Sequence, residues 1–408
     1  MARMRLENCK KRYSGESERA RKPEETLEII QPVAKKCGIT RVADITGLDR
    51  LGIFVFSCIR PGAADGAISV YNGKGMTESS ARVSAIMEGI ERYSAEINDR
   101  ELVYERFSSL GEKKAVNPST LILPAGVDPD SKIPWYQGFD IISEEDVLVP
   151  AHSVFHPVPY GAVRFFRTST NGIASGNTPE EAVLHGLCEV IERDAWSLAE
   201  ASGFSGPVLK NITDPNLNKV ISLFEDNGVE VTLRDITADN GIPTIAAVSD
   251  DVKLKDPSLL CIGMGTSLSP VVAALRAITE VAQSRATQIH GAREDTTDAD
   301  FRKKLGYDRT KRLNKKWFET SESKDFSEMP MFESDDFLTD ISYVSKKLQE
   351  KSGVSRIIVS DLSIVDADIK VVRVVVPGLE TFSIDSERAG ERCRNARRNR
   401  VFRSKPEH

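Results

Sequence analysis

The chain has 408 residues, of which 40% are hydrophobic and 28% are charged, values typical of a soluble globular protein with a substantial core. The formal net charge is −6, which argues against a nucleic-acid-binding protein. The first residues lack the apolar stretch of a signal peptide, and no apolar run reaches the length of a membrane span. The six cysteines are scattered without a CxxC pair, so we expect reduced thiols and a cytoplasmic location.

Three segments of the chain share one pattern. Each joins a short β-like run, a glycine-containing turn, a hydroxyl residue and a long helical pattern, and the segments are residues 67–96, 168–196 and 259–288. Thr77, Thr178 and Ser269 are predicted helix N-caps, because their side chains can accept a hydrogen bond from a free backbone N–H. Thr178 is followed by Pro179 and, three residues on, by Glu181, which predicts a capping box.

The three predicted helices share one register when positions are counted from their caps. Small residues stand four and eight positions on and predict a seam where another backbone packs closely: Ala81, Ala182, Ala273, Ala85, Gly186 and Ala277. The residues eleven and fourteen positions on are Glu88, Glu189, Glu280, Glu91, Glu192 and Gln283. Positions three apart lie on one helix face. One such pair would be interpreted as an exposed, salt-bridged face, but three copies at the same offsets favour a shared cation site.

The missing ligand types indicate which cation this is. No histidine follows a helix glutamate by three positions and the sequence has no thiolate cluster, so ligation by oxygen alone favours magnesium or calcium. Magnesium is often held by a few carboxylates together with substrate phosphates, which indicates a nucleotide. Residues 172–178 lack the lysine of a P-loop, and residues 73–75 and 263–265 are interpreted as common turns. Arg92 and Arg193 are candidate phosphate contacts or partners of the glutamates.

These residues match the motifs of a known family. The chain resembles the YcaO family, whose ATP-site motifs correspond here to Ser84–Arg92 (SxxxExxER), Asn177–Glu181 with Glu189–Arg193, and Glu280–Gln283 (ExxQ). Flanking segments that also resemble the family are Lys22–Thr26, Arg41–Gly52 and Val376–Glu380. The resemblance implies one α/β domain over residues 1–408, in which mixed sheets and helices contain an internally repeated strand, glycine turn and helix.

The resemblance also implies ATP and Mg²⁺ as cofactors. The expected metal ligands are Glu88, Glu91, Glu189, Glu192 and Glu280. The residues expected around the nucleotide are Lys22, Ser84, Asn177, Glu181, Arg193 and Gln283. Arg92 joins them as the candidate phosphate contact named above. Glu88, Glu192 and Arg193 are the expected catalytic residues.

The implied chemistry is activation of a peptide backbone amide. The amide oxygen attacks the γ-phosphate of ATP, a nucleophile adds to the amide carbon, and phosphate leaves with the former amide oxygen. A Cys, Ser or Thr side chain of the peptide gives an azoline, external sulfide gives a thioamide, and an amine gives an amidine. Catalysis of the first step rests on positioning and charge neutralisation, which agrees with the scarcity of histidine.

Two features of the sequence favour sulfide as the nucleophile. The chain ends without the Pro-rich PxPxP tail of azoline-forming members, and it lacks a fused N-terminal substrate-binding domain. It resembles stand-alone archaeal members that thioamidate a glycine in the α subunit of methyl-coenzyme M reductase, often with a TfuA-type partner that delivers sulfide. Thioamidation is therefore expected, and a homodimer is compatible with the resemblance. The alternatives are azoline cyclodehydration, support of ribosomal-protein methylthiolation, or a non-catalytic peptide-binding scaffold.

Three further segments carry predictions about organisation. Residues 293–340 are polar and predict a surface insertion, with Trp317 and Phe318 as anchors to the body. Residues 357–362 and 371–376 predict two buried strands. Residues 388–408 form a basic tail, which is either a solvated helix face, a docking surface for an acidic partner, or a source of cations for phosphate.

Overall fold

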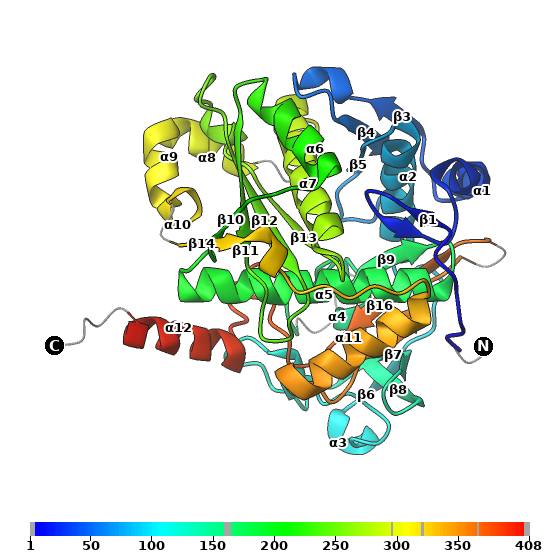
Figure 1. The fold of residues 1–408 in the computed structure, drawn as a ribbon. Helices are drawn as coiled ribbons and strands as arrows, with labels where there is room; N and C mark the ends of the chain where they lie inside the picture. Colours follow the sequence, from blue (N-terminus) through cyan, green and yellow to red (C-terminus); the bar gives the residue numbers. More distant parts are fainter. Residues whose placement is uncertain (1–4, 159–164, 295–296, 320–321, 365–366, 404–408) are drawn as a thin grey trace.

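The computed structural model describes residues 5–158, 165–294, 297–319, 322–364 and 367–403. It confirms the predicted mixed α/β architecture, with several β-sheets covered by helices (Figure 1). Long helix α5 crosses the middle of the molecule in this view. Helices α2 and α7 lie on one side of it, and α11 and α12 lie on the other.

The strands form four sheets within the described residues. The three-stranded sheet has the order β3-β4-β5 (Arg41–Asp44, Phe54–Ile59, Val70–Gly75). The six-stranded sheet has the order β6-β7-β15-β16-β9, with β8 paired to β7 (Val103–Glu105, Ile133–Asp140, Ile358–Asp361, Lys370–Val375, Ile173–Gly176, Glu145–Pro150). The five-stranded sheet has the order β13-β12-β11-β10-β14 (Ile262–Thr266, Thr244–Asp250, Glu230–Asp235, Val208–Lys210, Ser323–Asp325). A short hairpin joins β1 and β2 (Tyr13–Ser14, Glu18–Arg19).

The helices differ widely in length. They are α1 (Pro23–Lys36), α2 (Glu78–Ser94), α3 (Phe107–Leu110), α4 (Ala151–Val154), α5 (Pro179–Ser202), α6 (Pro215–Glu225), α7 (Pro270–His290), α8 (Thr297–Leu305), α9 (Tyr307–Leu313), α10 (Lys315–Phe318), α11 (Phe337–Ser352) and α12 (Glu391–Arg403). Short 3₁₀ turns are η1 (Thr46–Leu48), η2 (Pro118–Leu121), η3 (Pro257–Leu259) and η4 (Phe326–Glu328).

The predicted helix starts are confirmed in all three copies. Thr77, Thr178 and Ser269 are N-caps of α2, α5 and α7, and each side chain accepts a hydrogen bond from the backbone N–H three residues on. The capping box predicted for α5 is only half formed. The Glu181 carboxylate accepts from the Ala20 N–H at 2.9 Å instead of reaching back to its own cap. A long-range partner therefore replaces the local one.

The glycines at residues 73–75 and 263–265 lie within strands β5 and β13, so their interpretation as turns is wrong. A Cβ on Gly73 would lie 1.9 Å from the Ala85 nitrogen, and one on Gly265 would lie 2.0 Å from the Ala273 carbonyl oxygen. Glycine is needed there because each helix backbone packs directly on its strand. The small residues of the helix seam and the strand glycines are thus two halves of one close contact.

The three copies close into a ring. Strands β5, β9 and β13 each stand at the edge of a different sheet and precede α2, α5 and α7 along the chain. Each helix packs on its own strand and also on the strand of another copy: α2 on β9, α5 on β13, and α7 on β5. The matching helix faces consequently meet around one centre. This closure brings together residues that are about a hundred positions apart in the sequence.

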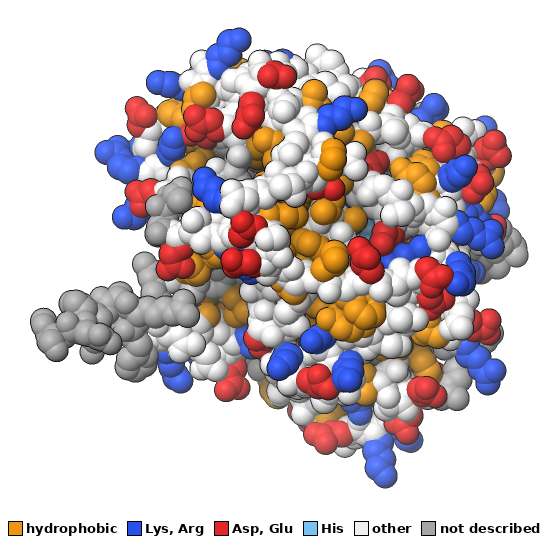
Figure 2. Space-filling view, in the orientation of Figure 1, with side chains coloured by type: hydrophobic (Ala, Val, Ile, Leu, Met, Phe, Trp, Pro, Cys, Tyr) orange, Lys and Arg blue, Asp and Glu red, His pale blue; other side chains and the backbone are white. Residues whose placement is uncertain are grey.

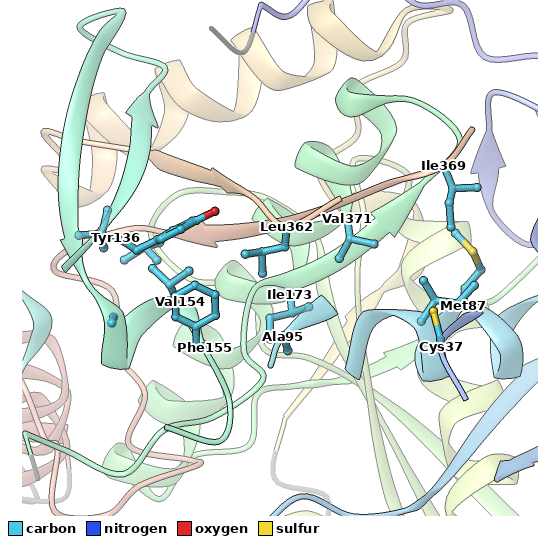
Figure 3. Close-up of a cluster of buried hydrophobic side chains, with 14 of the residues drawn as sticks. Cys37, Met87, Ala95, Tyr136, Val154, Phe155, Ile173, Leu362, Ile369 and Val371 are labelled. Atoms are coloured by element: carbon cyan, nitrogen blue, oxygen red, sulfur yellow. The ribbon is translucent and has the colours of Figure 1, made fainter. Parts of the chain in front are cut away.

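Two buried strands confirm the predictions for residues 357–362 and 371–376. Strands β15 and β16 pair antiparallel and contribute to the largest hydrophobic cluster. Figure 3 shows Ile173 of β9 and Val371 of β16 in this cluster, together with Met87 of α2. The core therefore links the first repeated helix to the strand of the second copy.

The described part of residues 293–340 is largely ordered secondary structure. It includes α8, α9, α10 and β14, which pairs parallel with β10, and Trp317 is 1% exposed, as an anchor would be. The tail helix α12 is tied to the body by Arg392, which forms ion pairs with Asp194 and Asp239. Acidic and basic side chains are interspersed over the face shown in Figure 2. Among the described helices, none is both long and apolar enough to cross a membrane.

Candidate functional site

A cavity of about 580 Å³ lies where the three repeated helices meet. Every predicted site residue except Lys22 lines it: Ser84, Glu88, Glu91, Arg92, Asn177, Glu181, Glu189, Glu192, Arg193, Glu280 and Gln283. Lys22 is the N-cap of α1, next to the lining residues Arg21 and Pro23. The ring of copies therefore gathers the predicted residues into one site.

Most of the glutamates in the cavity have a polar partner. Glu88 forms an ion pair with Arg92, four residues on in the same helix. Glu91 accepts hydrogen bonds from the Ser175 backbone N–H at 2.8 Å and from the Ser175 hydroxyl at 2.6 Å. The Glu192 carboxylate lies 3.6 Å from the Arg193 guanidinium.

The third copy makes its contacts with the first. The Glu280 carboxylate lies 3.3 Å from the ammonium group of Lys74 in β5. Gln283 donates a hydrogen bond to the Asn72 carbonyl oxygen at 2.8 Å. The exchange of the expected glutamate for Gln283 thus gives an amide that anchors α7 to β5, so that the site is asymmetric.

Burial and mutual repulsion perturb the carboxyl groups. Burial, helped by the nearby charge of Glu88, raises the pKa of Glu91 to about 8. Burial raises the pKa of Glu189 to about 7, against the opposing effect of Arg193. Burial would also raise the pKa of Glu280, but Lys74 and Arg193 hold this pKa below its ordinary value. The raised pKa values show that the ionised carboxylates are destabilised in the cavity, and a bound cation would stabilise them.

The carboxylates surround the cavity without forming a closed metal cage. Within the described residues, no group of three or more His, Cys, Asp or Glu side chains is arranged to hold a metal ion. Glu192 Oε2 is buried and has no hydrogen-bond partner. Magnesium usually takes only one or two protein carboxylates and completes its octahedron with water and phosphate oxygens. The donor set therefore fits a magnesium ion that binds together with a polyphosphate.

Several cationic residues of the cavity were missed by the sequence reasoning. Arg19, Arg21, Lys74 and Arg276 line it. Arg276 could have been found, since it precedes Glu280 by four positions and shares its helix face. Lys74 was hidden in the Gly-Lys-Gly segment interpreted as a turn. The two N-terminal arginines had no local pattern.

A histidine connects two of these missed cations. The Arg19 guanidinium lies 3.0 Å from His185 Nδ1, and the Arg276 guanidinium lies 2.9 Å from His185 Nε2. Burial and both arginines hold the pKa of His185 well below its ordinary value. A neutral imidazole has only one acceptor nitrogen. His185 can therefore accept from one arginine at a time, and Arg19 also forms an ion pair with Glu181 at 3.5 Å. Arg276 is thus the arginine that can turn to an anion in the cavity.

Comparison with known proteins settles the family. Residues 72–380 match the model of the YcaO family, described as an ATP- and Mg²⁺-binding cyclodehydratase. The chain belongs to the YcaO family. This membership confirms the expected cofactors, ATP and Mg²⁺, and identifies the chain as an ATP-dependent enzyme of the YcaO type that activates peptide backbones.

Similar proteins match the chain over nearly its whole length. An uncharacterized protein of Methanothermobacter thermautotrophicus is 48% identical, over 92% of this chain and 98% of the relative. An uncharacterized protein in the tfuA 3′ region of Rhizobium leguminosarum bv. trifolii is 35% identical, over 89% of both chains. The structure of YcaO from Methanopyrus kandleri, solved with AMPPCP and Mg²⁺, matches with a TM-score of 0.78 and 30% identity, covering 94% of this chain and 98% of that one.

Two of the flanking YcaO motifs support the site without lining the cavity. Asp49 accepts a hydrogen bond from buried Arg285 of α7 at 2.8 Å. Glu380 accepts from the Gly390 and Cys393 backbone N–H groups, both at 2.8 Å, at the start of α12. These motifs therefore hold helices in place around the cavity.

Proposed function

We propose that this YcaO protein forms a thioamide in a peptide backbone, with a glycine of the methyl-coenzyme M reductase α subunit as the substrate. The observation that carries this proposal is the 48% identity with a methanogen protein, over 98% of that relative. Such a full-length match fits the stand-alone archaeal type of YcaO chain. We place the reaction in the cytoplasm.

The proposed reaction balances without an oxidant or reductant. The amide oxygen attacks the γ-phosphorus, and the bond between that phosphorus and the leaving ADP breaks. Hydrosulfide then adds to the amide carbon, and phosphate departs with the former amide oxygen. The products are the thioamide, ADP and phosphate.

The residues of the cavity suit this chemistry. Glu88, Glu91, Glu189, Glu192 and Glu280 are the proposed magnesium ligands, shared with the phosphates of ATP. Bound magnesium would supply positive charge that neutralises the transferring phosphoryl group. Arg193, Arg276 and Lys74 line the same wall and would stabilise the remaining phosphate charge. Ser84, Asn177, Glu181 and Gln283 would orient the nucleotide.

A TfuA-like protein is the proposed partner. Support comes from the relative encoded in a tfuA 3′ region, which matches 89% of this chain. The partner would release sulfide to the YcaO chain. Mixing the two purified proteins and measuring co-elution tests this pairing.

The second candidate reaction is azoline formation, which the family description as a cyclodehydratase favours. Mass spectrometry separates the two after incubation of a glycine-containing peptide with ATP, Mg²⁺ and sulfide. Thioamide formation adds the mass difference between sulfur and oxygen, whereas azoline formation removes one water. The test peptide carries Cys or Ser beside the glycine. If this peptide loses water and gains no sulfur, the proposal is refuted.

A further inference from the structure

A second, smaller cavity of about 50 Å³ lies beside the large one. Its polar lining includes Thr120, Ser153, Asn171, Arg373, Thr381 and Arg388. Adjacent residues line the two spaces: Thr170 and Glu189 face the large cavity, while Asn171 and Val190 face the small one. The two cavities therefore lie on either side of the segment at Thr170 and Asn171 and of helix α5 at Glu189 and Val190.

Two buried arginines face the small cavity. The side chains of Arg373 and Arg388 belong to residues that are 6% and 8% exposed. Among the described residues, no carboxylate lies within ion-pair distance of either guanidinium. Burying a cation without an anion is costly, so an anion in this space would stabilise both groups.

The hydrogen bonds of Arg373 leave part of its guanidinium unused. Arg373 Nη1 donates to the Ser169 carbonyl oxygen at 2.8 Å, whereas its buried Nε has no acceptor within the described part of the chain. Arg388 donates to the carbonyl oxygens of Ile122 and Leu121 and lies over the Phe166 ring, 4.2 Å from its centroid. Both arginines are therefore held by neutral groups, and carboxylates attract them only from beyond ion-pair distance: Glu189 attracts Arg373, and Asp385 and Glu380 attract Arg388.

Arg234 shows that this pattern is not a general property of buried arginines in the chain. It is 1% exposed and has no carboxylate partner in the described ranges, but its Nε, Nη1 and Nη2 atoms each donate to a backbone carbonyl. Among the described residues, Arg373 by comparison donates to one acceptor, the Ser169 carbonyl oxygen. Burial lowers the pKa of Arg373 to about 9, against the opposing attraction of Glu189, and the charges of Arg388 and Arg92 lower it further.

The other polar groups that line the small cavity are an imidazole, an amide and several hydroxyls, from Thr120, His152, Ser153, Ser169, Asn171 and Thr381. Ser153 Oγ and Thr381 Oγ1 are buried, have no hydrogen-bond partner among the residues that the structure describes, and can donate to an anion. A water molecule needs roughly 10–15 Å³ of such space, so the cavity has room for a few waters or one small anion. A nucleotide or a peptide carboxylate with its chain does not fit.

We propose that this cavity binds a small inorganic anion and holds the hydrosulfide nucleophile beside the phosphoryl-transfer cavity. The assignment of hydrosulfide rests on the proposed thioamidation. Hydrosulfide carries one negative charge and presents a single heavy atom, so it can occupy the space between two fixed guanidinium groups and two hydroxyls. Phosphate has four oxygens to satisfy and suits this small set of free donors less well.

Crystals of the wild-type chain with bromide or with phosphate test the cavity directly. Bromide is a monovalent anion of similar size to hydrosulfide, and its anomalous scattering locates it. The expected result is bromide against Arg373 Nε. The assignment of the cavity to hydrosulfide is overturned if the crystals contain no bromide there. It is also overturned if phosphate occupies the cavity and bromide does not.

Kinetics test whether the anion is the nucleophile. Arg373→Gln should raise the KM for sulfide about tenfold, more than the KM for ATP, because a charge-assisted hydrogen bond is lost. Arg373→Lys, which keeps the charge, should recover part of this loss. Arg234→Gln is the matched control, because it also removes a buried arginine but lies outside both cavities, and it should leave the KM for sulfide unchanged.

The outcomes separate this inference from the proposed function. An unchanged KM for sulfide in folded Arg373→Gln, or an equal rise in Arg234→Gln, overturns the nucleophile site. If Arg373→Gln does not fold, the KM for sulfide of Arg373→Lys and the presence or absence of bromide in the crystals test the nucleophile site instead. Thioamide formation without bromide in the cavity refutes the inference alone. Bromide in the cavity of a chain that forms no thioamide refutes the proposed function and removes hydrosulfide as the occupant.

Discussion

Replacing Glu189 by Gln should stabilise the protein in the absence of nucleotide. Burial raises the pKa of Glu189 from 4.5 to about 7. One pKa unit corresponds to about 1.4 kcal/mol, so the rise from 4.5 to about 7 means that the ionised carboxylate costs the fold at most about 3.5 kcal/mol. Water in the cavity screens this charge, and we expect a gain of about 1–2 kcal/mol for Glu189→Gln at pH 8.

The effect should depend on pH in a defined direction. Between pH 4.5 and about 7 the folded carboxyl keeps a proton that the unfolded chain has lost, so the stability of the wild type falls as pH rises through this range. Glutamine resembles the protonated side chain and removes this loss. The difference between variant and wild type should therefore be largest at pH 8 and shrink towards zero at pH 5.

Urea unfolding at both pH values measures the difference. Glu200→Gln is the matched control on the same helix, because Glu200 forms an ion pair with Lys316 and accepts from Trp317 Nε1 at 3.1 Å. This control should lose about 1 kcal/mol at pH 8. A Glu189→Gln variant that is less stable at pH 8, or equally changed at both pH values, would refute the charge-repulsion argument. Mg²⁺ with ATP should stabilise the wild type more than Glu189→Gln.

Three further predictions address the ring and the thiols. Glu88→Gln should keep the fold but lower Mg²⁺-dependent ATP hydrolysis about 100-fold; unfolding seen by circular dichroism would indicate a structural role instead. Gly73→Ala should cost about 2–3 kcal/mol in urea unfolding, because its Cβ would lie 1.9 Å from the Ala85 nitrogen, whereas Gly47→Ala meets nothing within 4 Å and should be nearly neutral. Burial raises the pKa of Cys58 to about 12, so this thiol should react with maleimide at pH 8 only after unfolding, and rapid labelling of the folded chain would contradict its burial.

Local rules of helix formation made much of the fold predictable. The caps Thr77, Thr178 and Ser269 and the register of the glutamates follow from interactions within a few residues. The two strands β15 and β16 followed from short β-branched runs. All of these depend on sequence neighbours, so they can be read without knowledge of the chain path.

Contacts between distant segments could not be read in this way. Glu181 has the spacing of a local capping residue, but it accepts from Ala20 because β2 and the chain after it pass over the start of α5. Lys74 is one residue of a strand that packs on α7, and only this packing brings it to Glu280. The small cavity with Arg373 has no sequence signal, because β16 and the loops around it come from separate parts of the chain.

The sequence by itself determined three helices with one register and a shared acidic face. It determined this because helical periodicity and capping act over a few residues. Only the tertiary structure decided that the copies close into a ring, with each helix on the strand of another copy, and that Arg19, Lys74 and Arg276 join the same cavity. The physical reason is that the cationic residues beside the carboxylates come from segments far apart in the sequence. Only the folding of the whole chain brings these segments together, so no local sequence pattern predicts them.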